Sequence, residues 1–443
     1  MKKLLQTIII FGCITMQSQD LKNICAEKMQ QIDNLIKTES YFISEKIILE
    51  SLKCQNLNEN FFLNSEKALH YLMLRAKPDE QTKYIKNLVQ IFDLYDFNFP
   101  ENTNRNAIKK ALLLYDNKAT SNQEIFEILD KRIKVNKIDF VNPAEINLYF
   151  RLFVETKKNF QTYDEVNSLL ENYIMTNSII IENENRINQK LNTTNLSNAD
   201  KKKLQTDTNA FLVTRKNINS QIVNFLNCDN LSSYCKSNID KNASNDYWLK
   251  LMTEKMFEKN CYSTEIFNKL AMQSNNINST SKSNYYLAQN YLYKNDNDKA
   301  VFYFNESAEK ETNINQKASI YYTIATTIFE INNKPQCKLY LDKAISTAPT
   351  FGQPYVFLAE LYKASVDECA KNDFEKKAIN WLLIETYNKA NKADSNLIGQ
   401  TKDLIADALK NIPTKLEIKK AKMSEKQLTF NCWFKETILI PKK

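Results

Sequence analysis

Two neighbouring stretches of the chain repeat one pattern of small and bulky residues in the same phase. In residues 318–349, Ile324 and Ala325 stand in the first half, and Cys337, Leu341 and Ala344 in the second. Small residues let two helices approach closely, and large ones fill the space to the next hairpin. The pattern therefore predicts stacked helix–turn–helix units. The same unit also supplies Tyr321, Ile328 and Pro349, and the unit before it supplies Leu287, Ala288, Tyr291, Ala300, Phe304 and Ser307.

A third unit follows in phase and then departs from the pattern. It carries an insertion, "KASVDECAKNDFEKKAINW", before its second helix resumes. Upstream, "SNDYWLKLMTEKMFEKNC" and "STEIFNKLAMQSN" predict one more helix pair. A helix–turn–helix of about 34 residues with these residue types is the tetratricopeptide repeat (TPR), so we expect a TPR array over residues 228–412. The third unit is marked by Tyr355, Leu358, Ala359, Tyr362, Leu383, Tyr387 and Ala390.

Glycine is scarce, with only 3 in 443 residues, at positions 12, 352 and 399. A Gly-rich phosphate loop or a dinucleotide fingerprint cannot be written with so few. Sheet-rich and doubly wound folds also need more turn glycines, because glycine supplies positive φ angles. The chain is 43% hydrophobic, which is ample for a core, and the scarcity of glycine makes a nearly all-helical chain the best fit. We expect an all-α, TPR-like α-α superhelix with a long antiparallel coiled-coil hairpin and a short extended or β C-terminal tail.

Residues that carry catalysis or bind metals are nearly missing. The single histidine, His70, is expected on a helix near a packed face. A single histidine excludes zinc motifs that need two histidines, and it excludes any Ser–His triad away from His70. The chain has no CxxC pair, so a zinc knuckle is not expected. The net charge of +8 is spread along the chain, and its densest runs, such as "KKK" at 201–203, fit solvated helix faces. We therefore predict no catalytic, cofactor or metal site and no nucleic-acid partner.

The N-terminus, "MKKLLQTIIIFGCITMQSQD", predicts a secretory signal peptide over residues 1–18. Two lysines precede an apolar stretch that is too short to span a bilayer. Cleavage after Ser18 would make Gln19 the first mature residue; alternatively, "IFGC" is a poor lipobox that would place a lipid anchor on Cys13. No later segment is long and apolar enough for a transmembrane span. We expect an exported protein, periplasmic or associated with the outer membrane.

Eight of the 9 cysteines lie beyond this leader, and export permits disulfides. Cys228 and Cys235 in "NCDNLSSYCK" are close enough in sequence for a local bridge, although spacing alone does not determine the pairing. Cys337 occupies a small-residue packing position and is expected as a buried thiol. The others are Cys25, Cys54, Cys261, Cys369 and Cys432.

A different element is predicted over residues 162–227. Apolar residues recur there every seven positions, which is typical of a coiled-coil seam. The polar turn "NTTNLSNAD" divides the stretch into two arms, so we expect an antiparallel hairpin about 40 Å long at ~1.5 Å per residue. Polar residues at Asn177, Glu184 and Arg215 weaken the seam, and the hairpin should lean on neighbouring helices. The seam residues are Val166, Tyr173, Ile180 and Ile187 in one arm and Leu204, Phe211, Ile218 and Phe225 in the other.

The flanking regions have their own signals. Residues 19–161 predict divergent helical repeats, with helix starts at Ser121, where Glu124 completes a capping box, and at Asn142, which precedes Pro143. The tail over residues 413–443, with "QLTFNCWFKETILIPKK", predicts one or two short strands or an extended strap over the last helix. Its Trp433 and Phe434 are expected to pack.

Several motifs resemble exported TPR proteins of the Bacteroidetes type. They are "MKKLL…MQSQD", "YDFNFPENTNRNAIKKALLLYDNK", "NCDNLSSYCK…WLKLMTEKMFEKNC", "APTFGQPYVFLAELYKASVDECAKNDFEKKAINW…TYNKANKAD" and "IPTKLEI…FNCWFKE". The resemblance covers most of the mature chain. It implies a TPR fold and export, and it implies no activity.

TPR arrays bind partner segments on a concave surface lined by first helices. A clamp for a C-terminal carboxylate needs paired Lys and Asn there, and only Lys282 is suggestive, so we reject that partner class. The competing interpretation is that the aromatic residues pack against an N-terminal helix or the insertion. The candidate partner-binding residues are Lys282, Tyr285, Gln289, Tyr293, Tyr322, Thr326 and Phe329.

Three functions remain. The first is a non-enzymatic scaffold of the cell envelope that binds another exported protein through the concave groove or the coiled-coil arm. The second is a glycan-binding outer-membrane lipoprotein of the starch-utilisation type, although 3 Trp and 3 Gly are few for its loops. The third is an enzyme with a carboxylate site in the N-terminal half, where no paired-acid spacing stands out.

Overall fold

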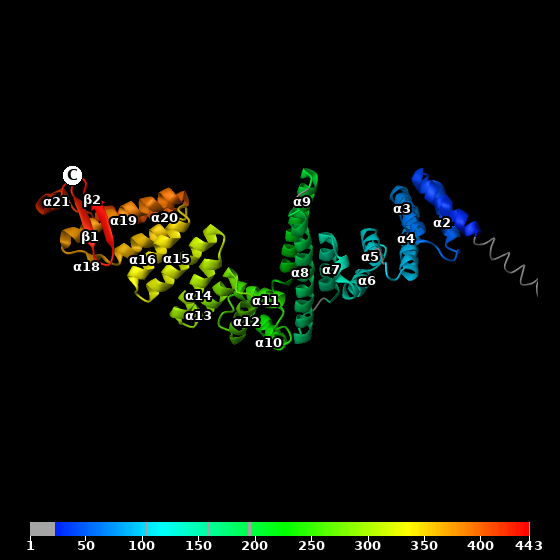
Figure 1. Ribbon diagram of the computed structural model, residues 1–443, viewed down its shortest axis with the longest axis horizontal. Helices are drawn as coiled ribbons and strands as arrows, with labels where there is room; N and C mark the ends of the chain where they lie inside the picture. The colour runs from blue at the N-terminus through cyan, green and yellow to red at the C-terminus, as the bar shows by residue number, and fades with distance from the viewer. Residues whose placement is uncertain (1–22, 103–104, 158–159, 194–195, 443) are drawn as a thin grey trace, which may run out of the picture. The chain divides into compact units, whose positions relative to one another are not determined.

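The computed structural model describes residues 23–102, 105–157, 160–193 and 196–442. The predicted signal peptide over residues 1–18, and Cys13 with it, lies outside the described residues. The chain forms two compact units, Met1–Phe225 and Leu226–Lys443, and each is described by itself. In the part of the chain that the structure describes, the regular elements of both units are helices, apart from a two-stranded sheet near the C-terminus (Figure 1).

In the first unit, helices that follow one another in the chain pack against one another. The disulfide Cys25–Cys54 joins the first helical segment to the loop after α2. Phe61, Phe62 and Tyr95 are fully buried between α3 and α4. The elements are a helical segment at 23–37, α2 (Tyr41–Ser51), α3 (Glu59–Arg75), α4 (Pro78–Asn98), α5 (Asn106–Asp116), α6 (Asn122–Val135), η1 (Lys137–Asp139), α7 (Pro143–Lys157), α8 (Tyr163–Leu191) and α9 (Asn198–Ile222).

The predicted helix starts of the first unit are confirmed. The Ser121 hydroxyl accepts a hydrogen bond from the Glu124 backbone N–H and begins α6. Asn142 Oδ1 accepts from the Ala144 N–H, and Pro143 is the first residue of α7. Each cap supplies a partner to one of the backbone N–H groups that a helix start leaves unpaired. His70 lies on α3, as predicted, and its side chain is exposed.

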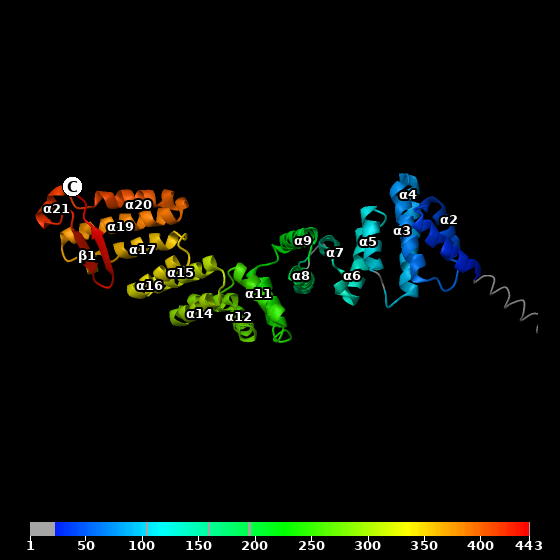
Figure 2. The same ribbon diagram turned by 45° about the horizontal axis from the view of Figure 1, so that its top comes forward.

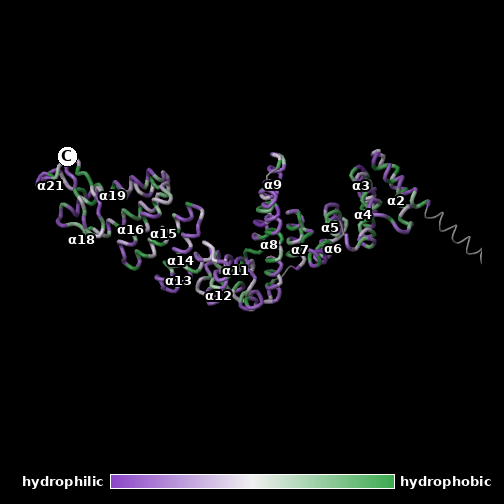
Figure 3. The backbone as a smooth tube through the Cα atoms, in the orientation of Figure 1, coloured by the Kyte–Doolittle hydropathy of each residue, from purple (hydrophilic) through white to green (hydrophobic). Residues whose placement is uncertain are grey.

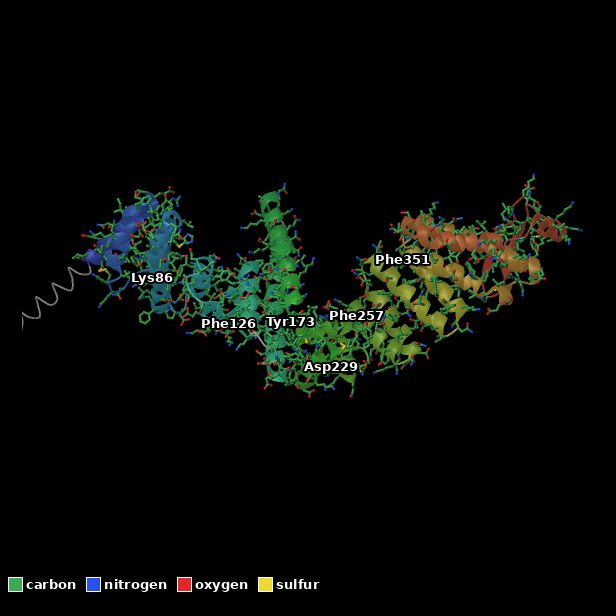
Figure 4. All side chains as sticks on the ribbon, turned by 180° about the vertical axis from the view of Figure 1, so that it is seen from behind. Lys86, Phe126, Tyr173, Asp229, Phe257 and Phe351 are labelled. Carbon is green, nitrogen blue, oxygen red and sulfur yellow. A yellow bond between two sulfur atoms is a disulfide. The ribbon has the colours of Figure 1, made fainter. Side chains whose placement is uncertain are left out.

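The predicted long hairpin is formed by α8 and α9, which lie side by side in Figures 1 and 2. At ~1.5 Å per residue its arms measure about 44 and 38 Å. The seam residues of α8 are buried, among them Tyr173, labelled in Figure 4. In the return arm Phe211 and Ile218 are buried and Leu204 is half-buried, whereas Phe225 lies beyond the end of α9 at Ile222 and is half-buried there. The heptad pattern therefore identified the contact face of both arms.

Polar residues of the hairpin pair across the seam or with the neighbouring helix. Arg215 Nη2 lies 2.6 Å from Glu184 Oε2, and the Tyr173 hydroxyl donates to Asn219 Oδ1 at 2.8 Å. Asn183 Nδ2 donates to the Phe140 carbonyl just before α7. Both arms also pack against α7. The hairpin therefore packs against α7, as predicted. Glu184 and Arg215, two of the polar residues that interrupt the predicted seam, form an ion pair with each other across it.

The Arg215–Glu184 pair gives a testable energetic prediction. Arg215→Met should destabilise the first unit by about 1–2 kcal/mol, because the Glu184 carboxylate, whose side chain is only 18% exposed, loses its partner. Adding Glu184→Leu should restore most of that loss, since an apolar pair can replace a partly buried ion pair. Urea unfolding followed by circular dichroism measures both values. A double variant less stable than either single variant would contradict the prediction.

The second unit is a TPR-like stack of helix hairpins (Figure 2). Its small residues Ala288, Ala325, Cys337 and Ala344 are fully buried where the paired helices meet. The pairs are α11 with α12, α13 with α14, α15 with α16, and α17 with α19. The helices are α10 (Cys228–Asn238), α11 (Asp246–Glu258), α12 (Glu265–Ile277), α13 (Ser281–Tyr293), α14 (Asn297–Lys310), α15 (Ile314–Glu330), α16 (Lys334–Thr347), α17 (Gln353–Lys363), α18 (Val366–Cys369), α19 (Asp373–Ala393), η2 (Ser395–Leu397), α20 (Ile398–Lys410) and α21 (Lys415–Ala421).

The insertion in the third hairpin is shorter than predicted. Helix α19 already begins at Asp373, because Asn372 Oδ1 accepts from the Glu375 N–H and caps it. Only α18 and its flanking turns are inserted. Before α17, Gly352 lies so close to the end of α19 that a Cβ there would stand 2.9 Å from the Ala390 carbonyl oxygen. Glycine is therefore needed at this corner because the chain passes so close to α19. Its φ is negative, so a left-handed backbone conformation is not the reason.

The C-terminal tail forms an antiparallel hairpin of β1 (Gln427–Asn431) and β2 (Lys435–Leu439), in which Leu428 faces Ile438. Phe434 is buried with its ring 4.7 Å from that of Tyr362 on α17, and the Tyr362 hydroxyl donates to Glu436. The disulfide Cys369–Cys432 fastens the hairpin to α18. The predicted strands are confirmed, and they cover the third repeat hairpin.

The suggested bridge between Cys228 and Cys235 is wrong. Both residues lie on α10, where seven positions correspond to about 10 Å of rise, beyond the Cα separation that a disulfide spans. Cys228 instead pairs with Cys261, just after α11. Cys235 and Cys337 are buried free thiols, and burial raises the pKa of each to about 12. Both thiols therefore stay protonated and unreactive near neutral pH.

Hydrophobic and hydrophilic residues interleave along the helices in Figure 3. Among the described residues, no helix combines the length and the apolar character that a membrane span requires.

Candidate partner-binding groove

The residues predicted to bind a partner lie on α13 and α15, the first helices of two consecutive repeat hairpins. Helix α13 begins at a reciprocal capping box, in which Thr280 and Ser283 each accept from the other's backbone N–H. Helix α15 begins where Asn313 Oδ1 accepts from the N–H groups of Asn315 and Gln316. These caps fix the residue at which each helix begins.

On α13 the predicted residues face one side but have different surroundings. The Lys282 ammonium pairs with Glu254 Oε1 at 2.6 Å. The Tyr285 ring is half-buried between Phe257 and Phe304, at centroid distances of 5.9 and 5.3 Å. Gln289 Nε2 donates to the Tyr285 hydroxyl at 3.3 Å, and Tyr293 is 55% exposed.

On α15 the predicted residues contact the next hairpin. The Tyr322 ring meets Phe351 and Phe357 edge-on, and the Phe329 ring meets Phe357 at 5.3 Å. Thr326 donates its hydroxyl to the Thr323 carbonyl of its own helix. These side chains are half-buried by the first helix of the following repeat, rather than by an N-terminal helix or the insertion.

A groove of about 480 Å³ opens at the N-terminal ends of α13 and α15. Of the seven predicted residues, only Lys282 and Tyr285 line it. The groove has an aromatic and aliphatic floor and a rim of hydroxyl, amide and charged groups, so it can contact an apolar side chain and hydrogen-bond to the main chain beside it. The remaining lining residues are Phe257, Ser281, Tyr286, Ser307, Glu311, Gln316, Ser319 and Ile320.

A second hollow of about 320 Å³ continues the groove toward α17. Its lining residues are Asn315, Ser319, Thr350 and Phe351, so Ser319 belongs to both hollows. Phe257, which lines the first hollow, and Phe351, which lines the second, are labelled in Figure 4. We call this surface, from Phe257 to Phe351, the repeat groove.

Two charged side chains line the repeat groove, and one of them has an ion-pair partner among the described residues. Lys282 is neutralised by Glu254, and Glu311 accepts a hydrogen bond from the Ser281 hydroxyl at 2.9 Å. Burial, and after it the carboxylates of Glu254 and Glu258, raises the pKa of Tyr286. Burial likewise raises the pKa of Tyr322. Both phenols therefore remain neutral hydrogen-bonding groups.

Sequence reasoning missed most of this lining. Ser281 stands one helical turn before Tyr285, and Ser319 one turn before Tyr322, so the groove lies nearer the helix starts than predicted. A search one turn toward the capping residues would have found both serines. Phe257 and Phe351 come from the hairpins on either side, and no local signal assigns them to α13 or α15.

Known proteins add little to this geometry. No protein-family model matches the chain, and no curated protein matches it. In structure, the chain is similar to the C-terminal part of a TPR repeat-containing protein from Cytophaga hutchinsonii, with 14% identity, a TM-score of 0.30, and coverage of 65% of this chain and 97% of that one.

It is also similar to yeast Tom70, with 13% identity and a TM-score of 0.26 over 90% of this chain and 83% of that one. The third similar structure is the APC/C hetero-tetramer Cut9–Hcn1, with 10% identity and a TM-score of 0.32 over 90% and 86%. At such scores the fold assignment rests on the helix pairs and buried small residues of this chain itself.

The lining of the repeat groove combines hydrogen-bonding groups with apolar surface. Tyr286 is protonated and Lys282 is paired with Glu254, so neither is an activated nucleophile, and Glu311 is the one carboxylate among the lining residues. Among the residues that the structure describes, no group of three or more His, Cys, Asp or Glu is placed to hold a metal ion. The lining residues can hydrogen-bond to a polar chain and bury apolar side chains.

Proposed function

We propose that this chain is a non-enzymatic protein–protein interaction scaffold of the cell envelope, which binds an extended segment of another exported protein in the repeat groove. The observation that carries the proposal is the lining from Phe257 to Phe351, formed by two hollows that share Ser319 and combine aromatic rings with hydroxyl and amide groups. A stack of helix hairpins presents such a surface without any loop having to be ordered first.

The lining suits an extended peptide. The Ser319 hydroxyl can hydrogen-bond to a peptide N–H or C=O group, and the Ser281 hydroxyl, which already donates to Glu311, can accept from a peptide N–H. Tyr285 and Phe351 can bury alternate side chains of the peptide. Salt should weaken the binding of a segment that carries a positive charge, because Glu311 has no ion-pair partner among the described residues, whereas Lys282 is already paired with Glu254. The α8–α9 hairpin offers a second surface for a partner in the same role.

Export is part of the proposal. Three disulfides join described cysteines, and disulfides persist in oxidising compartments. Together with the signal peptide expected over residues 1–18, they support a periplasmic or outer-membrane-associated protein. The alternative of lipidation at Cys13 would tether the same scaffold to a membrane.

A photo-crosslinking amino acid placed at Ser319 tests the groove. In envelope fractions of the source cell we expect it to capture one reproducible exported protein. The same amino acid at Ser346, an exposed serine on α16, is the matched control and should capture none. With the captured partner, Ser319→Trp should weaken binding more than about tenfold, because the indole fills the groove. Equal labelling from both positions would refute the groove as the binding surface.

Glycan binding is the second candidate. Aromatic rings beside hydroxyl groups, such as Tyr285 beside Ser281, also suit sugar rings. A glycan array separates the two functions: a saturable glycan signal that Ser319→Trp abolishes would favour the lipoprotein of the starch-utilisation type, and would displace the scaffold proposal.

A further inference from the structure

A cavity of about 530 Å³ lies within the first unit and plays no part in the repeat groove. It is bounded by the start of α7, residues 183–190 of α8, residues 204–211 of α9, and Arg105 just before α5. Its lining residues are Arg105, Val141, Asn142, Pro143, Ala144, Asn183, Arg186, Ile187, Lys190, Leu204, Asp207, Ala210 and Phe211. We call it the arm cavity.

Two cations that line the arm cavity, Arg186 and Lys190, have no partner among the described residues. Arg186 and Lys190 stand one turn apart on α8, and the Arg186 side chain is half-buried. Among the described residues, neither side chain forms an ion pair or a hydrogen bond. Asp207, across the cavity on α9, is likewise unpaired. Two cations therefore face one carboxylate, and the resulting excess of positive charge favours an anion in the cavity.

Arg105, the third cation in the lining, already has protein partners. The Arg105 guanidinium contacts both carboxylate oxygens of Glu145 at 2.5 Å and donates to the Asp139 carbonyl at 2.8 Å. The amide of Asn183 is also used, because its Nδ2 donates to the carbonyls of Phe140 and Ile179. The groups left for a ligand are therefore Arg186 and Lys190, opposed by Asp207.

The remainder of the lining is apolar. Ile187 stands between the two cations on α8, and Leu204 and Phe211 face it from α9. Phe211 is only 2% exposed, so its ring is held in place by packing. A volume of this size is within the range of small-molecule sites, which combine apolar walls with a few placed polar groups.

We propose that the arm cavity binds a small carboxylate with an apolar body, such as a medium-chain acyl carboxylate. The carboxylate pairs with the Arg186 guanidinium, whose planar fork matches two carboxylate oxygens, and Lys190 adds a second positive charge. The apolar body contacts Ile187, Leu204 and Phe211. Asp207 repels the same carboxylate and limits the affinity.

Calorimetric titration of the full chain with octanoate tests the proposal, with octanamide as a neutral ligand of the same chain length. Octanoate should bind saturably at millimolar concentration or below, and octanamide at least about tenfold more weakly, because only the carboxylate gains the charge-assisted contacts.

Three variants locate the site. Arg186→Gln should weaken octanoate binding by about tenfold or more, while Asp207→Asn should strengthen it by removing the repulsion. Lys203→Gln is the matched control, since Lys203 is an exposed cation on α9 that does not line the cavity. Unchanged circular dichroism spectra and melting temperatures should show that each variant folds.

Four results would overturn the proposal: no octanoate binding, equal binding of octanamide, an affinity unchanged by Arg186→Gln, or a loss of affinity in Asp207→Asn. The opposite signs expected for Arg186→Gln and Asp207→Asn exclude a merely structural effect, because a structural defect in either variant would lower the affinity.

Discussion

Phe304→Ala is expected to destabilise the second unit by about 3–5 kcal/mol, the usual cost of emptying a fully buried phenylalanine position. Phe304 is 0% exposed on α14, and its ring supports Tyr285 from below at a centroid distance of 5.3 Å. The cavity left by the variant would remove that support. Urea unfolding followed by circular dichroism measures the loss of stability, and binding of the crosslinked partner should weaken as well.

The matched control lies on the same helix two residues earlier. Phe302 is 57% exposed, so Phe302→Ala should change the free energy of unfolding by less than about 0.5 kcal/mol. A similar loss of stability in Phe302→Ala and Phe304→Ala would contradict the prediction. It would mean that the face of α14 that carries Phe304 is not the buried one.

Replacing both Cys369 and Cys432 by serine should destabilise the second unit by up to about 4 kcal/mol. The reason is the length of the closed loop, because the two cysteines are 63 residues apart and their bond removes much of the freedom of the unfolded chain. The effect should be concentrated in the tail. Hydrogen exchange measured by mass spectrometry should show protection lost first over β1 and β2.

A second cysteine pair gives the control for this experiment. Serine at both Cys25 and Cys54 removes a disulfide from the first unit, so it should leave exchange over β1 and β2 unchanged. If the tail kept its protection without Cys369–Cys432, the contacts of Tyr362 with Phe434 and Glu436 would be sufficient to hold it.

Local patterns in the chain were enough to predict most helices. Ser121 and Asn142 mark helix starts because capping involves residues only two or three positions apart. The seven-residue period that includes Tyr173 and Ile180 identified the buried face of α8, since heptad spacing alone determines which side chains share a face. Asn372 shows where the local patterns failed. It caps α19 inside the stretch that we predicted to be an insertion in the repeat.

The repeat groove was predicted only in part. Tyr285 and Lys282 belong to it, and both were found from helix periodicity and the repeat phase. Tyr322 and Phe329 share that periodicity, yet they are covered by Phe357 of the next hairpin. Whether an aromatic residue on a first helix is free or covered depends on the neighbouring repeat, which lies about 34 residues away and varies independently.

The sequence by itself determined the helical class, the repeat phase, the long hairpin and the short strands, because each follows from spacing within one element. The tertiary structure decided the disulfide partners, such as Cys228 with Cys261, and the meeting of Arg186, Lys190 and Asp207 in one cavity. Those contacts join residues from different helices. Their distances depend on how whole helices pack against one another, and spacing along the chain carries no record of that packing.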